Sequence, residues 1–170
     1  VNSSFSCDSD VLNWIYNAYI STQLANMHGG VPSDCPHTER RGYTGDGQLV
    51  CNAAMTYLDA QSFYKKWIYD IADCQDKITG HVQYTAPFVP NSGGGPGGWG
   101  CAIVNVPYEY YRHYRDSSVL VDLYPNMLRY FEYLENHSKN DLVVSDRKGS
   151  WCLGEWVTPE QETLNLFSGI

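Results

Sequence analysis

Hydrophobic residues recur every three or four positions over several stretches of the chain, a spacing typical of helices that bury one face. The pattern predicts helices over residues 10–27, 45–58, 59–76, 107–114 and 117–136, and a last helix that begins near residue 159. The clearest apolar faces are those of 59–76 and 117–136, which carry Phe63, Trp67, Ile71 and Cys74, and Leu120, Leu123, Met127, Phe131 and Leu134. The pattern therefore predicts an all-α domain of layered helices with no large sheet.

Polar residues and prolines suggest where some of these helices begin. Asp8 or Ser9 is placed to cap the first helix, because its side chain can accept a hydrogen bond from a free backbone N–H. Asp59 is placed in the same way before the third helix. Pro107 fits the first turn of the fourth helix, where a missing N–H has no consequence.

Two stretches lack the helical pattern. Residues 79–100 are rich in proline and glycine, a composition that is common in linkers. Apolar residues before the glycine run and Trp99 after it favour an ordered loop at a functional site instead. Residues 141–149 are expected to form a loop or a short β-excursion around 142–144.

The segment 34–48 concentrates candidate chemistry, with three carboxylates, two arginines, a tyrosine and three glycines. We interpret it as an ordered loop between two helices, in which Asp34, Glu39 and Asp46 converge on one pocket. Carboxylates that lie close together perturb one another's proton affinity, which acid–base chemistry requires. The spacing alone is equally compatible with a solvated turn that carries surface ion pairs.

Composition narrows the class of partner. The chain has 170 residues, enough for one domain with a substantial core, and a net charge of −8. This charge argues against nucleic acid and against an anionic membrane surface, and no apolar run reaches the ~20 residues of a membrane span. Fourteen tyrosines and five tryptophans suit a sugar site, since each ring offers a flat apolar face and a polar edge, although most of them must pack in the core.

The six cysteines are scattered, and none forms a Cys-x-x-Cys pair. They give no support for a zinc site, and no metal or cofactor is expected. Buried free thiols are the favoured interpretation, and disulfides remain an alternative. The sequence does not indicate a cellular compartment.

The order of residues in 34–48 resembles the acidic signature of the bacterial α-L-rhamnosidases, glycoside hydrolase family 78. That signature runs Asp-Cys-Pro, then Glu with basic residues, then an aromatic residue and Gly-Asp-Gly/Ala-Gln. Gly98-Trp99-Gly100 and Gly154-Glu155-Trp156 follow in the expected order, so the resemblance covers most of the chain. It implies an (α/α)6 barrel of six helical hairpins, of which residues 1–170 make about half of the ring.

The resemblance also implies roles for individual residues. Glu39 matches the proposed general acid, which protonates the leaving oxygen in an inverting hydrolysis of terminal α-L-rhamnose. Asp34 and Asp46 match positions that hold rhamnose hydroxyls. The remaining expected sugar-binding residues, matched at aromatic or acidic positions of the pocket, are Tyr43, Trp99, Glu155 and Trp156.

The sequence departs from the family pattern in several places. Thr38 stands where Arg often precedes the acid, Cys101 stands where Asp often follows Gly-Trp-Gly, and Glu155 replaces an Asp. The family's catalytic base is a Glu in a later hairpin, and no residue of this chain matches its motif. We therefore expect a fragment of a longer enzyme that hydrolyses no rhamnoside alone.

Two other functions stay open on the sequence. The chain is also compatible with a non-catalytic helical module that binds sugar or assembles with another chain, or with another glycosidase on the same type of barrel. An incomplete ring leaves apolar helix faces uncovered, which predicts either self-association or further hairpins that cover them.

Overall fold

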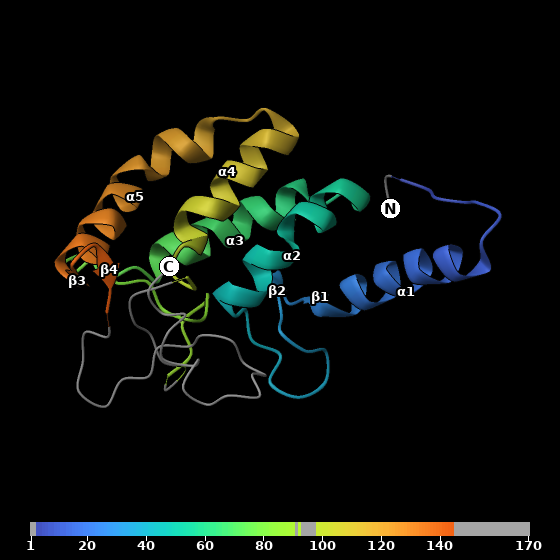
Figure 1. Ribbon diagram of the computed structural model, residues 1–170, viewed down its shortest axis with the longest axis horizontal. Helices are drawn as coiled ribbons and strands as arrows, with labels where there is room; N and C mark the ends of the chain where they lie inside the picture. The colour runs from blue at the N-terminus through green and yellow to red at the C-terminus, as the bar shows by residue number, and fades with distance from the viewer. Residues whose placement is uncertain (1–2, 91, 93–97, 145–170) are drawn as a thin grey trace.

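The computed structural model describes residues 3–90, 92 and 98–144, and this part of the chain is mainly helical (Figure 1). Its helices are α1 (Asp10–Asn26), α2 (Thr44–Tyr57), α3 (Gln61–Asp73), α4 (Ala102–Tyr114) and α5 (Ser118–Asn136). Two antiparallel pairs of short strands complete it: β1 (Met27–His28) with β2 (Val31–Pro32), and β3 (Ser138–Lys139) with β4 (Leu142–Val143). The all-α prediction is confirmed, as is the β-excursion around 142–144. The helix predicted from residue 159 lies outside the described residues.

The fourth helix begins earlier than the sequence pattern predicts. Pro107 lies inside α4 rather than in its first turn, and the N–H groups of Val104 and Asn105 both donate to the Cys101 carbonyl. The early start buries Ala102 and Ile103 completely. Burial of this apolar turn outweighs the one backbone hydrogen bond that the proline cannot make.

Of the helix caps predicted for α1 and α3, only the one on α1 is present. The Ser9 hydroxyl accepts a hydrogen bond from the Leu12 N–H at 3.4 Å at the start of α1. Asp59 does not cap α3, because the helix begins one position later, with Ala60 as the N-cap residue and no side-chain cap. Ala60 is fully buried, so packing rather than capping sets the start of α3.

Helix α4 is the centre of the packing, since α2, α3 and α5 all lie against it (Figure 1). The core between them is unusually aromatic. Its largest fully buried side chains are Trp67, Tyr64, Tyr84, Tyr110, Tyr130 and Tyr133. The predicted apolar face of α5 is slightly rotated, because Tyr130 and Tyr133 are buried while Phe131 is half exposed.

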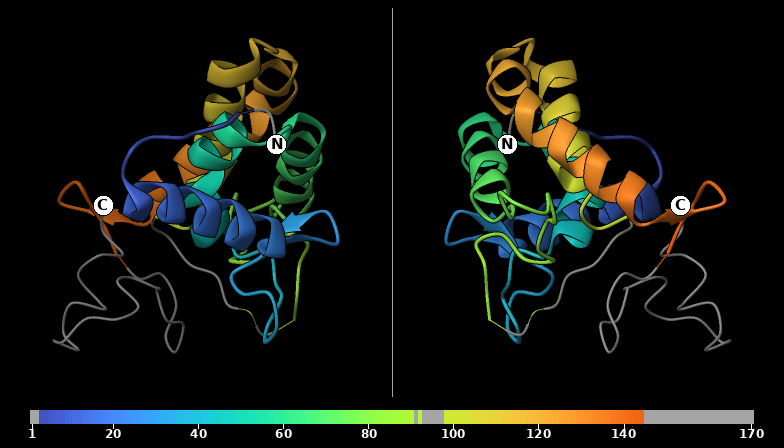
Figure 2. Two further views of the ribbon diagram at one scale, coloured as in Figure 1. Left: turned by 90° about the vertical axis from the view of Figure 1, so that its right-hand side faces the viewer. Right: turned by 90° about the vertical axis from the view of Figure 1, so that its left-hand side faces the viewer.

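The described part of 79–100 is an ordered segment rather than a linker. Val82, Tyr84 and Ala86 are buried, and the Trp67 indole N–H donates to the Ala86 carbonyl at 2.9 Å. Figure 2 shows this segment beside the loop that precedes α2, at the same edge of the molecule. A β-bridge between Tyr43 and Thr85 joins the two. The expectation of an ordered loop is confirmed for this part, while residues 93–97 of the glycine run lie outside the described residues.

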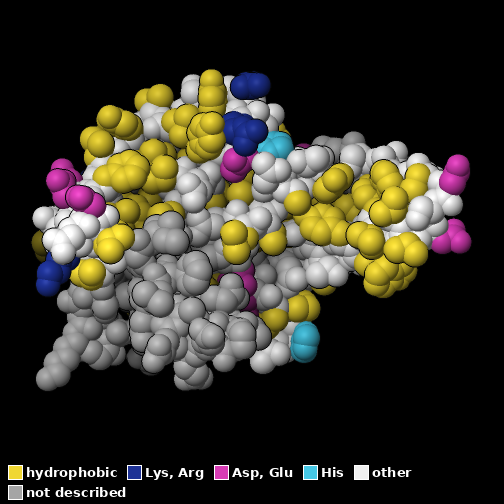
Figure 3. All heavy atoms as spheres, viewed as in Figure 1, with side chains coloured by type: hydrophobic (Ala, Val, Ile, Leu, Met, Phe, Trp, Pro, Cys, Tyr) yellow, Lys and Arg dark blue, Asp and Glu magenta, His cyan; other side chains and the backbone are white. Residues whose placement is uncertain are grey.

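Apolar side chains gather on the outer surfaces of α1 and α5 (Figure 3). The exposed large hydrophobic residues are Val11, Leu12, Trp14, Ile15 and Leu24 on α1, and Val121, Tyr124, Leu128 and Phe131 on α5. The predicted uncovered helix faces are therefore present, and what covers them stays a prediction. In the part of the chain that the structure describes, no helix combines the length and apolarity needed to cross a membrane.

All five cysteines in the described residues are free thiols: Cys7, Cys35, Cys51, Cys74 and Cys101. Cys51 is buried on α2, and the other four are partly buried. The interpretation as free thiols is confirmed for these five, and Cys152 lies outside the described residues.

Candidate active site

The loop between β2 and α2 is closed at its base by Asp34 and Arg41. The Asp34 N–H donates to the Arg41 carbonyl at 3.1 Å, and the Arg41 N–H donates to Asp34 Oδ1 at 3.0 Å. Within the loop, the Glu39 N–H donates to Cys35 Sγ at 3.2 Å. We call residues 35–40, which project between these two anchor residues, the acid loop. The Asp34 carboxylate is thus a structural part of the loop as well as a candidate ligand for sugar.

The chain passes from this loop directly into α2, held against the segment 79–90. The Thr44 N–H donates to the Tyr84 carbonyl at 2.8 Å, and the Ala86 N–H donates to the Gly42 carbonyl at 2.9 Å. A Cβ on Gly42 would overlap the Ala86 carbonyl, so only glycine allows this approach. These contacts fix the first turn of α2, and with it Asp46, relative to the acid loop.

The three predicted carboxylates interact electrostatically. Burial raises the pKa of Asp46 above its usual range, and the negative charges of Asp34 and Glu39 raise this pKa further. A hydrogen bond to backbone acts in the opposite direction. Glu39 is exposed, whereas Asp34 and Asp46 are half-buried. The structure therefore brings together an exposed carboxyl group and two partly buried ones, as the sequence predicts.

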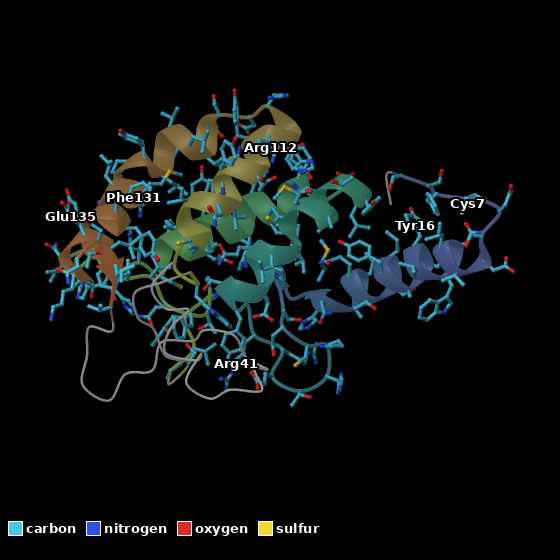
Figure 4. The ribbon with its side chains drawn as sticks, in the orientation of Figure 1. Cys7, Tyr16, Arg41, Arg112, Phe131 and Glu135 are labelled. Carbon is cyan, nitrogen blue, oxygen red and sulfur yellow. The ribbon has the colours of Figure 1, made fainter. Side chains whose placement is uncertain are left out.

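Tyr43 connects the carboxylates to an aromatic face. Burial raises the pKa of the Tyr43 hydroxyl; hydrogen bonding to Arg41 lowers it, and the charge of Glu39 raises it. Arg41, labelled in Figure 4, thus belongs to the site through Tyr43. The Tyr43 ring meets the Trp99 ring edge to face, with centroids 5.7 Å apart, and Trp99 also packs on Tyr84 at 5.3 Å.

The turn that carries Trp99 is held by Gln48, the last residue of the acidic signature. Gln48 Nε2 donates to the Gly98 carbonyl at 2.8 Å, and Asn105 Nδ2 donates to Gln48 Oε1 at 2.9 Å. Sequence reasoning assigned Gln48 no role beyond its place in the signature. Its side chain joins α2, the Trp99 turn and α4, so it positions the aromatic part of the site.

Five of the predicted site residues thus come together in the structure: Asp34, Glu39, Tyr43, Asp46 and Trp99. Glu155 and Trp156 lie outside the described residues, so their place in the site stays a prediction. The same holds for the concave pocket that Trp156 was expected to line. Among the described residues, no group of three or more His, Cys, Asp or Glu side chains could hold a metal ion.

Replacing Gly45 with Ala is expected to disturb the Trp99 ring. An added Cβ would lie 2.6 Å from Trp99 Cδ2, inside van der Waals contact. Overpacking of this kind costs about 1–3 kcal/mol, so the free energy of unfolding should fall by that amount in denaturant titration. Gly98→Ala is the matched control, because a Cβ there meets nothing within 4 Å. Equal stability losses in the two variants would contradict the close packing of Gly45 on Trp99.

Replacing Asp46 with Asn is expected to stabilise the protein near neutral pH. Because the folded state raises the pKa of Asp46, ionisation of this carboxyl destabilises the fold as pH rises above the usual carboxyl range. The melting temperature of Asp46→Asn should exceed that of the wild type at about pH 7, and the difference should vanish near about pH 3. Asp10→Asn, in the first turn of α1, controls for loss of charge at a helix N-terminus. A pH-independent difference would argue against ionisation of Asp46 as the cause.

Comparison with known proteins gives the same family throughout. A family model for the bacterial alpha-L-rhamnosidase 6 hairpin glycosidase domain matches residues 1–167. Alpha-L-rhamnosidases from Streptomyces avermitilis and Formosa agariphila are 35% and 30% identical over 157 and 162 residues, which cover 92% and 90% of this chain. These alignments span only 15% and 17% of the two relatives, so the chain corresponds to a small part of their length.

Solved structures agree with the sequence comparisons. An alpha-L-rhamnosidase from Dictyoglumus thermophilum matches 97% of this chain with a TM-score of 0.83 and 30% identity, over 18% of its own length. The Streptomyces avermitilis alpha-L-rhamnosidase in complex with L-rhamnose matches 97% of this chain with a TM-score of 0.71 and 31% identity, over 16% of its own length. The five helices thus fit part of a six-hairpin barrel, and the chain belongs to the bacterial α-L-rhamnosidase six-hairpin glycosidase family.

Proposed function

We propose that residues 1–170 are part of the catalytic domain of an α-L-rhamnosidase, which releases terminal non-reducing α-L-rhamnose from rhamnosides with inversion. The observation that carries this proposal is the acidic cluster of Asp34, Glu39 and Asp46 beside Tyr43 and Trp99, in a chain of the rhamnosidase family. A solved relative, the Streptomyces enzyme, was crystallised with L-rhamnose, which supports the choice of sugar.

Glu39 is the general acid in this proposal. Inverting hydrolysis needs a carboxylic acid that protonates the leaving oxygen, and Glu39 is an exposed carboxyl group that a substrate can reach. Its neighbours are the carboxylate of Asp46 and the hydroxyl of Tyr43.

The other residues hold the sugar. Asp34 uses Oδ1 for the Arg41 N–H, and we assign its second oxygen to a rhamnose hydroxyl. Asp46 accepts another hydroxyl, with its protonation tuned by burial. The edge-to-face pair of Tyr43 and Trp99 covers an apolar face of the ring. Glu155 and Trp156 are assigned to the same pocket from their motif alone.

The general base completes the reaction from outside residues 1–170. It must activate water on the face of the sugar opposite the acid. The family resemblance assigns this role to a Glu in a later hairpin, and the curated relatives are several times longer than this chain. We therefore propose that the cluster around Glu39 is the acid and sugar-binding half of the full active site.

An assay with aryl glycosides tests this function. The polypeptide that carries residues 1–170 together with the later hairpins should hydrolyse 4-nitrophenyl α-L-rhamnoside and leave the corresponding α-D-mannoside and β-D-glucoside intact. Residues 1–170 alone should release no nitrophenol. Binding of L-rhamnose without any turnover by the longer polypeptide would favour the non-catalytic sugar-binding module, and turnover of another glycoside would favour a different glycosidase.

A further inference from the structure

A line of hydrogen bonds runs from the β1–β2 hairpin to the acid loop. His28, the last residue of β1, lies between Ser33 and Arg40. Ser33 Oγ is 3.0 Å from His28 Nε2, and Arg40 Nη2 is 3.4 Å from His28 Nδ1. Ser33 is buried, His28 is half-buried and Arg40 is exposed, so the line connects the interior to the acid loop next to its base.

The chemistry of the three side chains fixes the direction of these hydrogen bonds. A guanidinium group can only donate, so His28 Nδ1 must be the acceptor and carries no proton. His28 is then neutral, with its proton on Nε2, and it donates to Ser33 Oγ. The Ser33 hydroxyl proton is left for one of three acceptors: the Asn26 carbonyl at 3.1 Å, the Cys35 carbonyl at 3.2 Å or Asn26 Oδ1 at 3.3 Å. The line of hydrogen bonds therefore ends at Asn26 or at Cys35.

The contact with His28 acts on a strained position of the acid loop. Arg40 has a φ of +54°, in the left-handed region, which a residue with a side chain rarely adopts. The contact with His28 is made in this conformation and helps to hold it. Arg40 directly follows Glu39, whose N–H is bound by Cys35 on the other side. The backbone around Glu39 is thus restrained from two directions.

We infer that His28 is a positioning residue for the general acid. With Ser33 and Arg40 it holds the turn at Glu39 and Arg40, so that the Glu39 carboxyl group meets the leaving oxygen at a productive angle. His28 itself contacts neither sugar nor leaving group in this role. The inference rests on the proposed function, because it assigns His28 to the acid step of that reaction.

The test compares two substrates that need the acid to different degrees. A methoxide leaving group needs protonation, whereas 2,4-dinitrophenolate departs without it. In the polypeptide that carries residues 1–170 and the later hairpins, His28→Ala should lower kcat about 10–100-fold on methyl α-L-rhamnoside, as misplacement of a catalytic group does. On 2,4-dinitrophenyl α-L-rhamnoside, kcat should change by no more than about twofold, because the acid contributes little there.

Further variants separate positioning from folding. His28→Gln should recover most of the activity on methyl α-L-rhamnoside, since its amide supplies one acceptor and one donor. Arg40→Met should show the same loss of activity on methyl α-L-rhamnoside alone. Because Arg40 is exposed, this variant still tests the contact if His28→Ala folds poorly. His113→Ala is the matched control, because His113 lies on α4 beside Glu109, on an element that carries none of the acid loop, and both activities should persist.

Equal losses on both substrates for His28→Ala and Arg40→Met would overturn the inference, as would no loss at all. Failure of the proposed function gives a different result from failure of the role of His28. If the wild-type polypeptide cleaves neither rhamnoside, or if Glu39→Gln lowers both activities equally, then the acid step itself is wrongly assigned and the inference falls with it.

Discussion

Replacing Glu39 with Gln is expected to lower kcat by about 10²–10⁴-fold on methyl α-L-rhamnoside, with little change in KM. The amide keeps the shape of the side chain and its capacity to touch the sugar but cannot give up a proton. The loss should be much smaller on 2,4-dinitrophenyl α-L-rhamnoside, whose leaving group departs as an anion. Steady-state kinetics on the polypeptide with residues 1–170 and the later hairpins measure both values.

Glu135→Gln is the matched control for this experiment. Glu135 is exposed near the end of α5, away from the acid loop, as the labels in Figure 4 show. Its replacement should leave both activities unchanged. If Glu39→Gln retained wild-type turnover of the methyl glycoside, another residue would have to be the acid.

Replacing Trp67 with Ala is expected to give the largest loss of stability among the described residues, about 3–5 kcal/mol in the free energy of unfolding. Trp67 is fully buried on α3, and its ring edge packs on Tyr64 with centroids 6.1 Å apart. Its indole N–H donates to the Ala86 carbonyl. Since Ala86 in turn donates to Gly42, the cavity should also loosen the segment that holds the acid loop.

Denaturant titration measures the stability loss of Trp67→Ala beside those of two comparison variants. Trp67→Phe keeps most of the ring volume but leaves the buried Ala86 carbonyl without its partner, so its loss should be smaller, about 1–3 kcal/mol. Trp14→Ala on α1 should change stability by less than about 0.5 kcal/mol, because Trp14 is 70% exposed. A Trp67→Ala loss no larger than that of Trp14→Ala would contradict a core built around Trp67.

Hydrophobic spacing predicted most of the fold because each of the five helices in the described residues carries its own apolar period. Phe63, Trp67 and Ile71 mark α3 by their period alone. The start of α4 was predicted too late. Pro107 suggested the first turn of a helix, and the sequence does not show that the turn before it is buried. Uncovered apolar helix faces were predicted, but not that Trp14 and Ile15 would lie on one of them, because that depends on which helices lie beside α1.

The sequence predicted which residues form the candidate site but not the contacts that hold them in place. The spacing of Asp34, Glu39 and Asp46 left their convergence open, and the resemblance of their motif to the rhamnosidase signature favoured it. The sequence did not reveal that Asp34 closes the loop through the Arg41 N–H, nor that His28 contacts Arg40. Such contacts depend on the hairpin and the loop folding against each other, and they leave no periodic pattern in the chain.

The stereochemistry of the released sugar tests the central claim most directly. Proton NMR during the first minutes of hydrolysis of 4-nitrophenyl α-L-rhamnoside, by the polypeptide with residues 1–170 and the later hairpins, distinguishes the two anomers. An inverting mechanism with Glu39 as the acid predicts that β-L-rhamnose appears first and then mutarotates. It also predicts that Glu39→Gln slows release from the methyl glycoside by about 10²–10⁴-fold. Initial release of α-L-rhamnose, or no release of rhamnose from either substrate, would contradict it.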